Sequence, residues 1–456
     1  MQINTNKTTE KLILILVFIL PFNFHYIFNF STTKDFLFFK ENLQYSLYFF
    51  DILFLIIFSS WFLRKIKTKK IPKNSKSNWF LFLLIIYLAW NSLFISTNSN
   101  ISLYNSLRLL EVIGFSLIFI DLIKTKKPFN QTLYLIFLSG VIQSIITLLQ
   151  FIFQKSLGLK YLGENALSPQ ILGVAKLEAG GEKFIRGYGT LPHPNLLGAF
   201  LFLSLVTGLY FILNKNFKIP FKLPRKFKKL QLKPKFKFLT GQIHFKIGLI
   251  LILTGIIVTF SRSIWLITAF LSIYLIIKYF KYLFYQKYRF KSVFKSIFPV
   301  LIILIILLIG FHKFIPARLC PGNCQDQSFS LRAQYADFSR KEILRHNCWL
   351  GVGIGQFPII FKDLNPQNLP AYNIQPVHNL YLLIWSEIGL VGLILLTLFI
   401  KSQSFKFSAK QTLFILLVSS FLLLGFFDHY FWTLPQGQFI FWLALALLLT
   451  SGKITK

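Results

Sequence analysis

Long apolar runs recur along the whole chain, and they constrain its fold more than any other feature. The sequence has 456 residues, of which 54% are hydrophobic and 18% aromatic. Its apolar stretches are about 20 residues long, the length that a helix needs to cross a bilayer. These runs are continuous rather than alternating, which argues against a membrane β-barrel. The sequence therefore predicts an all-α polytopic membrane protein.

We expect about twelve spans, because that many apolar runs reach or approach the required length. The first run, Leu12 to Phe28, has no small-residue cleavage site after it and is interpreted as a retained helix rather than a signal peptide. The expected spans are 12–30, 43–63, 79–96, 102–123, 131–153, 194–213, 246–260, 263–281, 297–315, 379–400, 411–431 and 437–451.

The distribution of positive charge between the spans predicts their orientation. One alternate set of polar segments holds 34 of the 50 Lys and Arg residues. The richer set faces the cytoplasm by the positive-inside rule, so both termini are predicted to be cytoplasmic. Topology also accounts for the net charge of +35, and we therefore expect no nucleic-acid partner.

The same topology divides the chain into five segments. A basic stretch, 214–246, is expected to touch anionic headgroups of the lipid bilayer on the cytoplasmic side. The segments are helices one to five (1–153), an outer loop (154–193), helices six to nine with the basic cytoplasmic loop (194–315), a large periplasmic loop (316–378) and helices ten to twelve (379–456).

The loop 316–378 is predicted to contain a surface helix. Leu331, Tyr335 and Phe338 are spaced along one helical face, and three glycines from Gly351 on end the helix in a flexible turn. This helix presents three cations near the membrane: Arg332, Arg340 and Arg345.

Two ionisable residues interrupt the apolar runs on the predicted outer side of the membrane. Arg262 lies in the tight turn between two spans, and His378 caps the outer end of the span that follows the large loop. Ionisable groups inside or beside spans are costly and usually functional. Guanidinium forks suit phosphate oxygens, and a neutral imidazole accepts a proton near neutral pH. We therefore expect an anion site with an adjacent base.

Other polar residues have simpler interpretations. Arg108 and Glu111 have the i, i+3 spacing of a structural ion pair. Glu387 is interpreted as making a helix-packing hydrogen bond. His193, directly before Pro194, is interpreted as a capping or loop residue. A small disulfide between Cys320 and Cys324 fits an oxidising compartment, with Cys348 left over. The cysteines give little support for a metal site, and no metal is expected.

Four motifs occur in a definite order around the long outer loop. They are Gly189-Thr190-x-x-x-Pro194-Asn195-x-x-Gly198, Ser261-Arg262, Arg332 followed by Gly351-Val352-Gly353-Ile354-Gly355-Gln356-Phe357, and His378-Asn379-x-x-Leu382-x-x-x-x-Glu387-x-Gly389-x-x-Gly392. In this order the chain resembles the O-antigen ligase and polymerase superfamily of bacterial envelope proteins.

That resemblance implies a membrane glycosyltransferase of the GT-C type in the bacterial inner membrane, active at the periplasmic face in lipopolysaccharide or polysaccharide biosynthesis. It would move a glycan from an undecaprenyl-diphosphate carrier to a hydroxyl of a glycan or of a lipid A core, without metal or cofactor. By the same resemblance, Arg262 and Arg332 hold the diphosphate and His378 is the general base. Residues expected to support them are Arg340, Arg345, His193, Asn195, Asn379 and Arg108.

The chemistry of the residues agrees with that expectation. A diphosphate leaving group needs fixed positive charge, and a hydroxyl nucleophile needs a proton acceptor. The absence of a carboxylate pair argues against a mechanism through a glycosyl-enzyme intermediate. Direct displacement with inversion is therefore expected. A polymerase remains an alternative, as do a transporter of a small anion such as bicarbonate and an assembly scaffold. The acceptor and the choice among the three loop arginines also stay open.

Overall fold

The computed structural model describes residues 2–28, 45–68, 76–213, 240–285, 311–319, 327–364, 373–403, 405, 408 and 411–454. These residues form two compact units that do not follow chain order. The first unit contains Met1–Leu16, Phe24–Thr125 and Gln325–Lys456, and the second contains Val17–Asn23 and Lys126–Cys324. Most of the expected span 297–315, most of the basic loop 214–246, Cys320 and Cys324 lie outside the described residues.

The expectation of a helical membrane protein is confirmed. Five described helical segments are long and apolar enough to cross a membrane, and three shorter apolar helices accompany them. The long segments are Lys76–Ile95, Ser99–Leu122, Lys126–Phe153, Pro194–Leu213 and Leu380–Ser402. The shorter helices are Ile243–Val258, Thr412–Leu424 and Pro435–Ser451. The total of about twelve spans stays a prediction.

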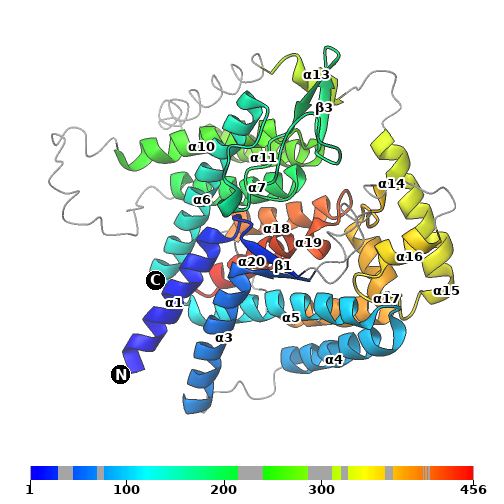
Figure 1. Ribbon diagram of the computed structural model, residues 1–456. Coiled ribbons are helices and arrows are strands. Elements are labelled where there is room, and N and C mark those ends of the chain that lie inside the picture. Colours follow the sequence, from blue (N-terminus) through cyan, green and yellow to red (C-terminus); the bar gives the residue numbers. More distant parts are fainter. Residues whose placement is uncertain are drawn as a thin grey trace. The chain divides into compact units, whose positions relative to one another are not determined.

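Helices of the first unit pack in pairs. Helix α4 lies against α17, and α5 lies against α20 (Figure 1). A hydrogen bond of 2.9 Å between the hydroxyl groups of Thr9 and Ser60 joins α1 to α3. The helices are α1 (Gln2–Ile19), α3 (Phe49–Thr68), α4 (Lys76–Trp90) with the π-helical turn η2 (Asn91–Ile95), α5 (Ser99–Leu122), α17 (Leu380–Ser402), α18 (Thr412–Leu424), α19 (Tyr430–Thr433) and α20 (Pro435–Ser451).

The first two expected spans are wrong at their outer ends. Strand β1 (His25–Phe28) pairs antiparallel with β2 (Tyr45–Tyr48), where continuous helices had been expected. Helix α1 ends at Ile19, two residues before Pro21, because the residue that precedes a proline is driven out of the helical region. Both strands are rich in aromatic residues, which favour extended backbone. These short strands are a local exception in a chain whose described residues are mainly helical, as expected.

The second unit is built on three packed helices. Helices α6 (Lys126–Phe153), α7 (Pro194–Leu213) and α10 (Thr240–Val258) contact one another, and α11 (Arg262–Tyr285) also contacts α7. The expected outer loop 154–193 contains the turn η3 (Lys160–Leu162) and a hairpin of β3 (Lys176–Ala179) and β4 (Glu182–Ile185). The short helix α13 (Phe314–Leu319) packs on β3.

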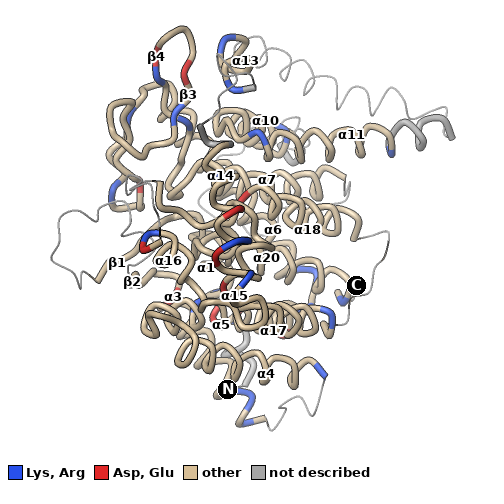
Figure 2. The backbone as a smooth tube through the Cα atoms, turned by 90° about the vertical axis from the view of Figure 1, so that its right-hand side faces the viewer, with Lys and Arg blue, Asp and Glu red and all other residues tan. Residues whose placement is uncertain are grey.

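Charge is scarce along the apolar helices of both units. In Figure 2 the tubes of α7, α18 and α20 are uniformly tan, whereas Lys and Arg collect near the ends of other helices. One cluster joins two helix ends: Asp121 of α5 binds Lys65 of α3 at 2.8 Å and Arg64 at 3.2 Å. Such a distribution is expected for helices that cross a bilayer, including those, such as α7 and α20, whose side chains are mostly buried against other helices.

A helix is present in the large loop where the sequence predicted one, and its position at the membrane surface stays a prediction. Helix α14 (Gln327–Phe338) continues through the π-helical turn η4 (Ser339–Leu344) into α15 (Arg345–Asn347), and α16 (Phe357–Asp363) follows. Tyr335 is fully buried, and its ring packs edge-on against Phe361 of α16. A hydrogen bond of 2.6 Å between Ser339 and Ser386 joins the loop helix to α17.

A break in α17 explains why glycines follow the loop helix, beginning at Gly351. Gly389 has φ 63° and ψ −178°, a backbone conformation that only glycine adopts readily. A Cβ at Gly389 would lie 2.3 Å from the carbonyl oxygen of Trp349, and one at Gly351 would lie 2.5 Å from that of Glu387. The turn expected to be flexible is therefore a close backbone contact.

Four backbone hydrogen bonds close the break. The amides of Val352 and Gly353 donate to the carbonyls of Ser386 and Glu387, at 3.0 and 2.8 Å. In the other direction, the amides of Leu390 and Val391 donate to Cys348 and Trp349, at 2.9 and 3.1 Å. Because unpaired backbone groups are costly at membrane depth, these bonds stabilise both the broken helix and the loop.

Gly389→Ala should lower the free energy of unfolding by roughly 3 kcal/mol or more, since backbone strain and overpacking each cost about 1–3 kcal/mol. Gly180→Ala is a matched control, because Gly180 has the same φ of 63° but nothing within 4 Å of an added Cβ. Its cost should be about 1 kcal/mol. Denaturant titration of the purified protein in detergent measures both. Equal losses for the two variants would contradict the proposed backbone contact.

Candidate active site

His378 lies directly before the first turn of α17. The sequence placed it as the cap of this helix, but the capping residue is Asn379, whose side chain accepts a hydrogen bond of 3.0 Å from the amide of Leu382. The amide of Leu380 donates to the carbonyl of Gly425, at 2.6 Å. The start of α17 is thereby joined to the end of α18, which brings His378 close to the residues that follow α18.

Three ring systems meet around His378. Its half-buried imidazole stacks on Tyr335 of α14, with ring centres 5.8 Å apart and planes at 13°. The ring of His429 approaches edge-on, with centres 4.8 Å apart. Asp428 is buried, and its carboxylate oxygen accepts a hydrogen bond of 2.9 Å from the amide of His429. The nitrogen and oxygen atoms that His378, Asp428 and His429 offer as ligands all lie within 4.8 Å of one another. We call these three residues the His–Asp–His cluster.

Burial is the main influence on the protonation of His429, and it favours the neutral form. Partial burial lowers its pKa, and the positive charge of Arg332 lowers it further, while Asp428 acts in the opposite direction. The Nδ1 atom of His429 is hydrogen-bonded to the hydroxyl of Thr433 at 2.8 Å. Burial also raises the pKa of Tyr335 to about 12, so its phenol stays protonated and donates to the carbonyl of Asn373.

The three loop arginines differ in their surroundings. Arg332 is half-buried on α14, one turn before Tyr335 and on the same face, and it acts electrostatically on His429. Arg340 and Arg345 are exposed on η4 and α15. Arg332 therefore shares the face of α14 from which Tyr335 contacts His378, and among the three it is the candidate for the loop cation.

In the second unit, Arg262 is the first residue of α11. It follows a tight turn in which Phe260 has φ 47°, an uncommon left-handed conformation for a residue other than glycine. The guanidinium is half-buried, and the first amides of α11 point toward the same end of the helix. Such a helix N-terminus attracts anions, and an adjacent arginine adds to that attraction.

Two further arginines hold the turn before Arg262, and the sequence interpretation missed both. Arg186 is buried; its Nε donates to the carbonyl of Thr259 at 2.7 Å, and its Nη2 donates to the side chain of Asn195 at 2.6 Å. Arg318 of α13 donates to the carbonyl of Phe260 at 2.9 Å. Arg186 could have been found from the sequence by its position just before the motif that begins at Gly189.

The two other candidate residues of the second unit, His193 and Asn195, have structural contacts. The Nδ1 atom of His193 accepts a hydrogen bond of 3.2 Å from the amide of Asn195, and its carbonyl accepts one of 3.0 Å from the amide of Leu197. His193 therefore caps α7, which begins at Pro194, as the sequence suggested. Asn195 is engaged with Arg186.

Arg108 also has a structural environment. It binds Asp51 at 2.5 Å and Glu111 at 3.1 Å, and it donates to the carbonyl of Ser46. Its guanidinium lies over the ring of Tyr104, with 5.0 Å to the centroid. The expected pair with Glu111 is present. Asp51 lies in the first turn of α3, directly after β2, which replaces the outer part of the expected span 43–63.

Glu387 makes the packing hydrogen bond that the sequence suggested. Its carboxylate accepts a bond of 2.7 Å from the indole N–H of Trp432 in α19. Glu387 and His378 thus have different partners.

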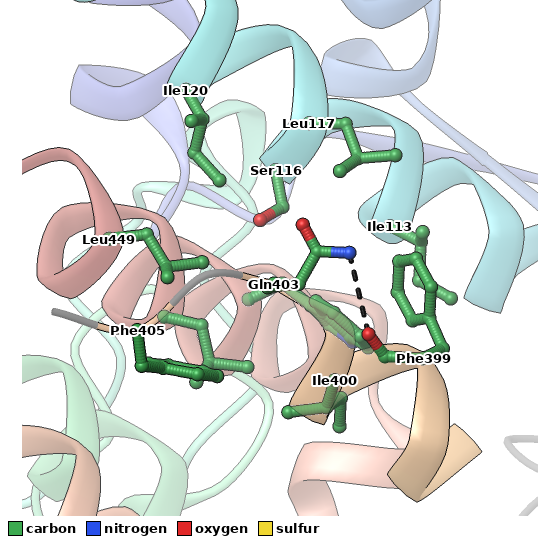
Figure 3. Close-up of a pocket in the computed structure, with 11 residues that line it drawn as sticks. Ile113, Ser116, Leu117, Ile120, Phe399, Ile400, Gln403, Phe405 and Leu449 are labelled. Atoms are coloured by element: carbon green, nitrogen blue, oxygen red, sulfur yellow. Dashed lines mark hydrogen bonds between the residues drawn. The ribbon is translucent and has the colours of Figure 1, made fainter. Parts of the chain in front are cut away.

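A pocket of the first unit lies far from the cluster along α17. It is mostly apolar and is lined at the C-terminal end of α17 by Phe399, Ile400 and Gln403, together with residues of α5 and α20 (Figure 3). The amide of Gln403 donates back to the carbonyl of Phe399, at 3.4 Å. His378 precedes the other end of this helix, whose 23 residues span about 35 Å. The pocket is therefore separate from the candidate site.

The comparisons with known proteins agree with the resemblance stated above. Residues 247–397 match the family described as O-Antigen ligase. The matched segment, about a third of the chain, includes Arg262, Arg332 and His378 but not the motif 189–198. No curated protein matches the chain. The match confirms the similarity to the O-antigen ligase superfamily and, with the apolar helices, supports an integral membrane enzyme of the ligase or polymerase type.

Arg186→Lys should destabilise the protein by about 2 kcal/mol, because lysine cannot replace a fork that bonds two buried acceptors. Lys183→Ala, an exposed position on β4, is the control and should change stability by less than about 0.5 kcal/mol. The melting transition in detergent gives the comparison. A loss no larger than that of the control would show that Arg186 does not hold the turn.

Proposed function

Starting from the match of residues 247–397 to the O-antigen ligase family, we propose that this protein is a membrane glycosyltransferase. It transfers a glycan from an undecaprenyl-diphosphate carrier to an acceptor hydroxyl at the periplasmic face of the bacterial inner membrane, with both termini in the cytoplasm. The contact of His378 with the helix that carries Arg332 is the observation that carries the proposal. It joins a proton acceptor and a phosphate-binding cation that lie far apart in the sequence.

The reaction is a single displacement. The acceptor oxygen attacks the anomeric carbon of the glycan while the bond from that carbon to the diphosphate oxygen breaks. The diphosphate leaves with the electron pair, and His378 takes the proton of the acceptor hydroxyl. Since the nucleophile enters opposite the leaving group, the configuration at the anomeric carbon inverts. The imidazolium afterwards releases the proton to water.

Arginine groups stabilise the charge that develops on the leaving diphosphate. Arg332 lies beside the cluster in the first unit, and Arg262 lies at the N-terminus of α11 in the second. Guanidinium groups bind phosphate oxygens in pairs, and fixed charges of this kind act without reorganisation during the reaction. The reaction needs no metal. Arg186, Arg318 and Asn379 act as positioning residues rather than as substrate ligands.

Transfer to a lipid A core or to another glycan uses the same chemistry. We propose ligase-type transfer ahead of polymerisation, and the two differ only in which hydroxyl reaches His378. The acceptor must therefore be identified by assay.

One observation favours the transporter alternative. Transporters often place ionisable groups on interrupted helices, and Glu387 lies beside the break in α17. However, the backbone groups at this break are bonded to residues 348–353, and Glu387 is bonded to Trp432. The interruption is thus occupied by protein, and the enzyme remains the better supported proposal.

Purified protein in nanodiscs, supplied with an undecaprenyl-diphosphate glycan and candidate acceptors, should form a glycosylated acceptor detectable by mass spectrometry. His378→Ala should slow transfer by about 100-fold or more, because a general base contributes about 10²–10⁴ to the rate. Arg332→Ala should reduce transfer strongly, whereas the exposed Arg340→Ala and Arg345→Ala should retain most of it. Undiminished transfer by His378→Ala rejects the base, and solute flux without transfer favours the transporter.

A shared site requires positions 262 and 378 to face the same side of the membrane. In a chain with Cys320, Cys324 and Cys348 changed to Ser, single cysteines at the two positions should both react with a membrane-impermeant thiol reagent added from outside. A cysteine in the basic loop, such as Lys222→Cys, should react only after permeabilisation. Labelling of the two positions from opposite sides would exclude one substrate for both.

A further inference from the structure

The His–Asp–His cluster contains the donor set of a transition-metal site. It offers two imidazole nitrogens and one carboxylate oxygen, all within 4.8 Å of one another. Bonds from Zn²⁺ to such ligands are about 2.0–2.2 Å long, so neighbouring ligands of a tetrahedral ion lie about 3.4 Å apart. Side-chain rotations that move the ligand atoms by about 1 Å would therefore close the cluster around an ion. A fourth coordination position would stay open.

The surroundings of His429 favour its use as a ligand. Its Nδ1 is engaged with Thr433, and an imidazole that donates from Nδ1 presents the lone pair of Nε2 to the cluster. A second hydrogen bond of this kind orients most histidine ligands in metal sites.

Backbone contacts hold the other two ligands near one another. The bond from Leu380 to the carbonyl of Gly425 brings the start of α17 to the end of α18, and Asp428 is held by the amide of His429. The ligands thus come from two segments joined by the fold, not from one flexible loop. Preformed arrangements of this kind reduce the entropy lost on binding.

We propose that His378, Asp428 and His429 bind one divalent cation of the Zn²⁺ or Co²⁺ type. Two nitrogen donors select such borderline ions over Mg²⁺ and Ca²⁺, which prefer oxygen. The positive charge of Arg332 opposes the cation, so the affinity is moderate and the ion exchanges readily.

The bound ion would be an inhibitor, not a cofactor. This consequence rests on the proposed function, because an ion on His378 occupies the lone pair that must accept the hydroxyl proton. The reaction itself still uses no metal. Millimolar Mg²⁺, which selects oxygen ligands, should leave transfer unchanged, and a chelator should restore transfer that Zn²⁺ has inhibited.

Cobalt titration tests the site without any substrate. The full-length chain in nanodiscs, with Cys320, Cys324 and Cys348 changed to Ser to remove thiolate ligands, is stripped with EDTA and titrated with Co²⁺. One Co²⁺ per chain should bind and give the visible absorption of a four- or five-coordinate ion. His429→Gln and His378→Gln should each weaken binding at least tenfold, whereas His346→Gln, an exposed histidine on α15, should not.

Thr433→Val provides a second test that leaves all three ligands in place. It removes the hydrogen bond that orients His429 and should weaken Co²⁺ binding about tenfold, with His378 intact. No stoichiometric binding, or equal affinity in the parent and in His429→Gln, would overturn the site. If the ion binds as expected but transfer continues at the same rate, the metal site stands and the assignment of His378 as base is overturned.

Discussion

The break in α17 is the constraint on which the first unit depends. Backbone groups at membrane depth have no water to bind, so a helix interrupted at Gly389 needs partners for the carbonyls and amides that it frees. The segment 348–353 supplies them through four hydrogen bonds. Such close approach requires residues without a Cβ, which is why Gly351 and Gly389 face each other's backbone. The loop helix that ends there is thereby held against α17.

This attachment explains how distant parts of the chain form one site. The loop helix carries Arg332 and Tyr335, and Tyr335 stacks on His378 just before α17 begins. The bond between Leu380 and Gly425 adds the turn that contains Asp428 and His429. Two imidazoles and a carboxylate are thus brought together by backbone contacts that lie outside the cluster itself. Both proposals made above, proton transfer by His378 and the binding of a metal ion, depend on this arrangement.

Much of the helical fold could be predicted, because apolar length and charge are local properties. Helix α7 begins and ends where span 194–213 was expected, and the spacing of Leu331, Tyr335 and Phe338 correctly predicted α14. The strands β1 and β2 were missed, since aromatic residues suit a membrane helix as well as a strand. Packing partners such as Trp432 for Glu387 leave no periodic trace in a sequence.

For the candidate site, too, the sequence suggested some residues and the tertiary structure added others. Order and spacing of residues suggested the family that residues 247–397 match. The same pattern made Arg262, His378 and three loop arginines candidates for the site. That Tyr335 of α14 stacks on His378, and that Asp428 and His429 lie near it, follows from how α14, α17 and α18 pack. Contacts between residues that lie far apart in the chain depend on backbone pairing in three dimensions, and no local pattern records that pairing.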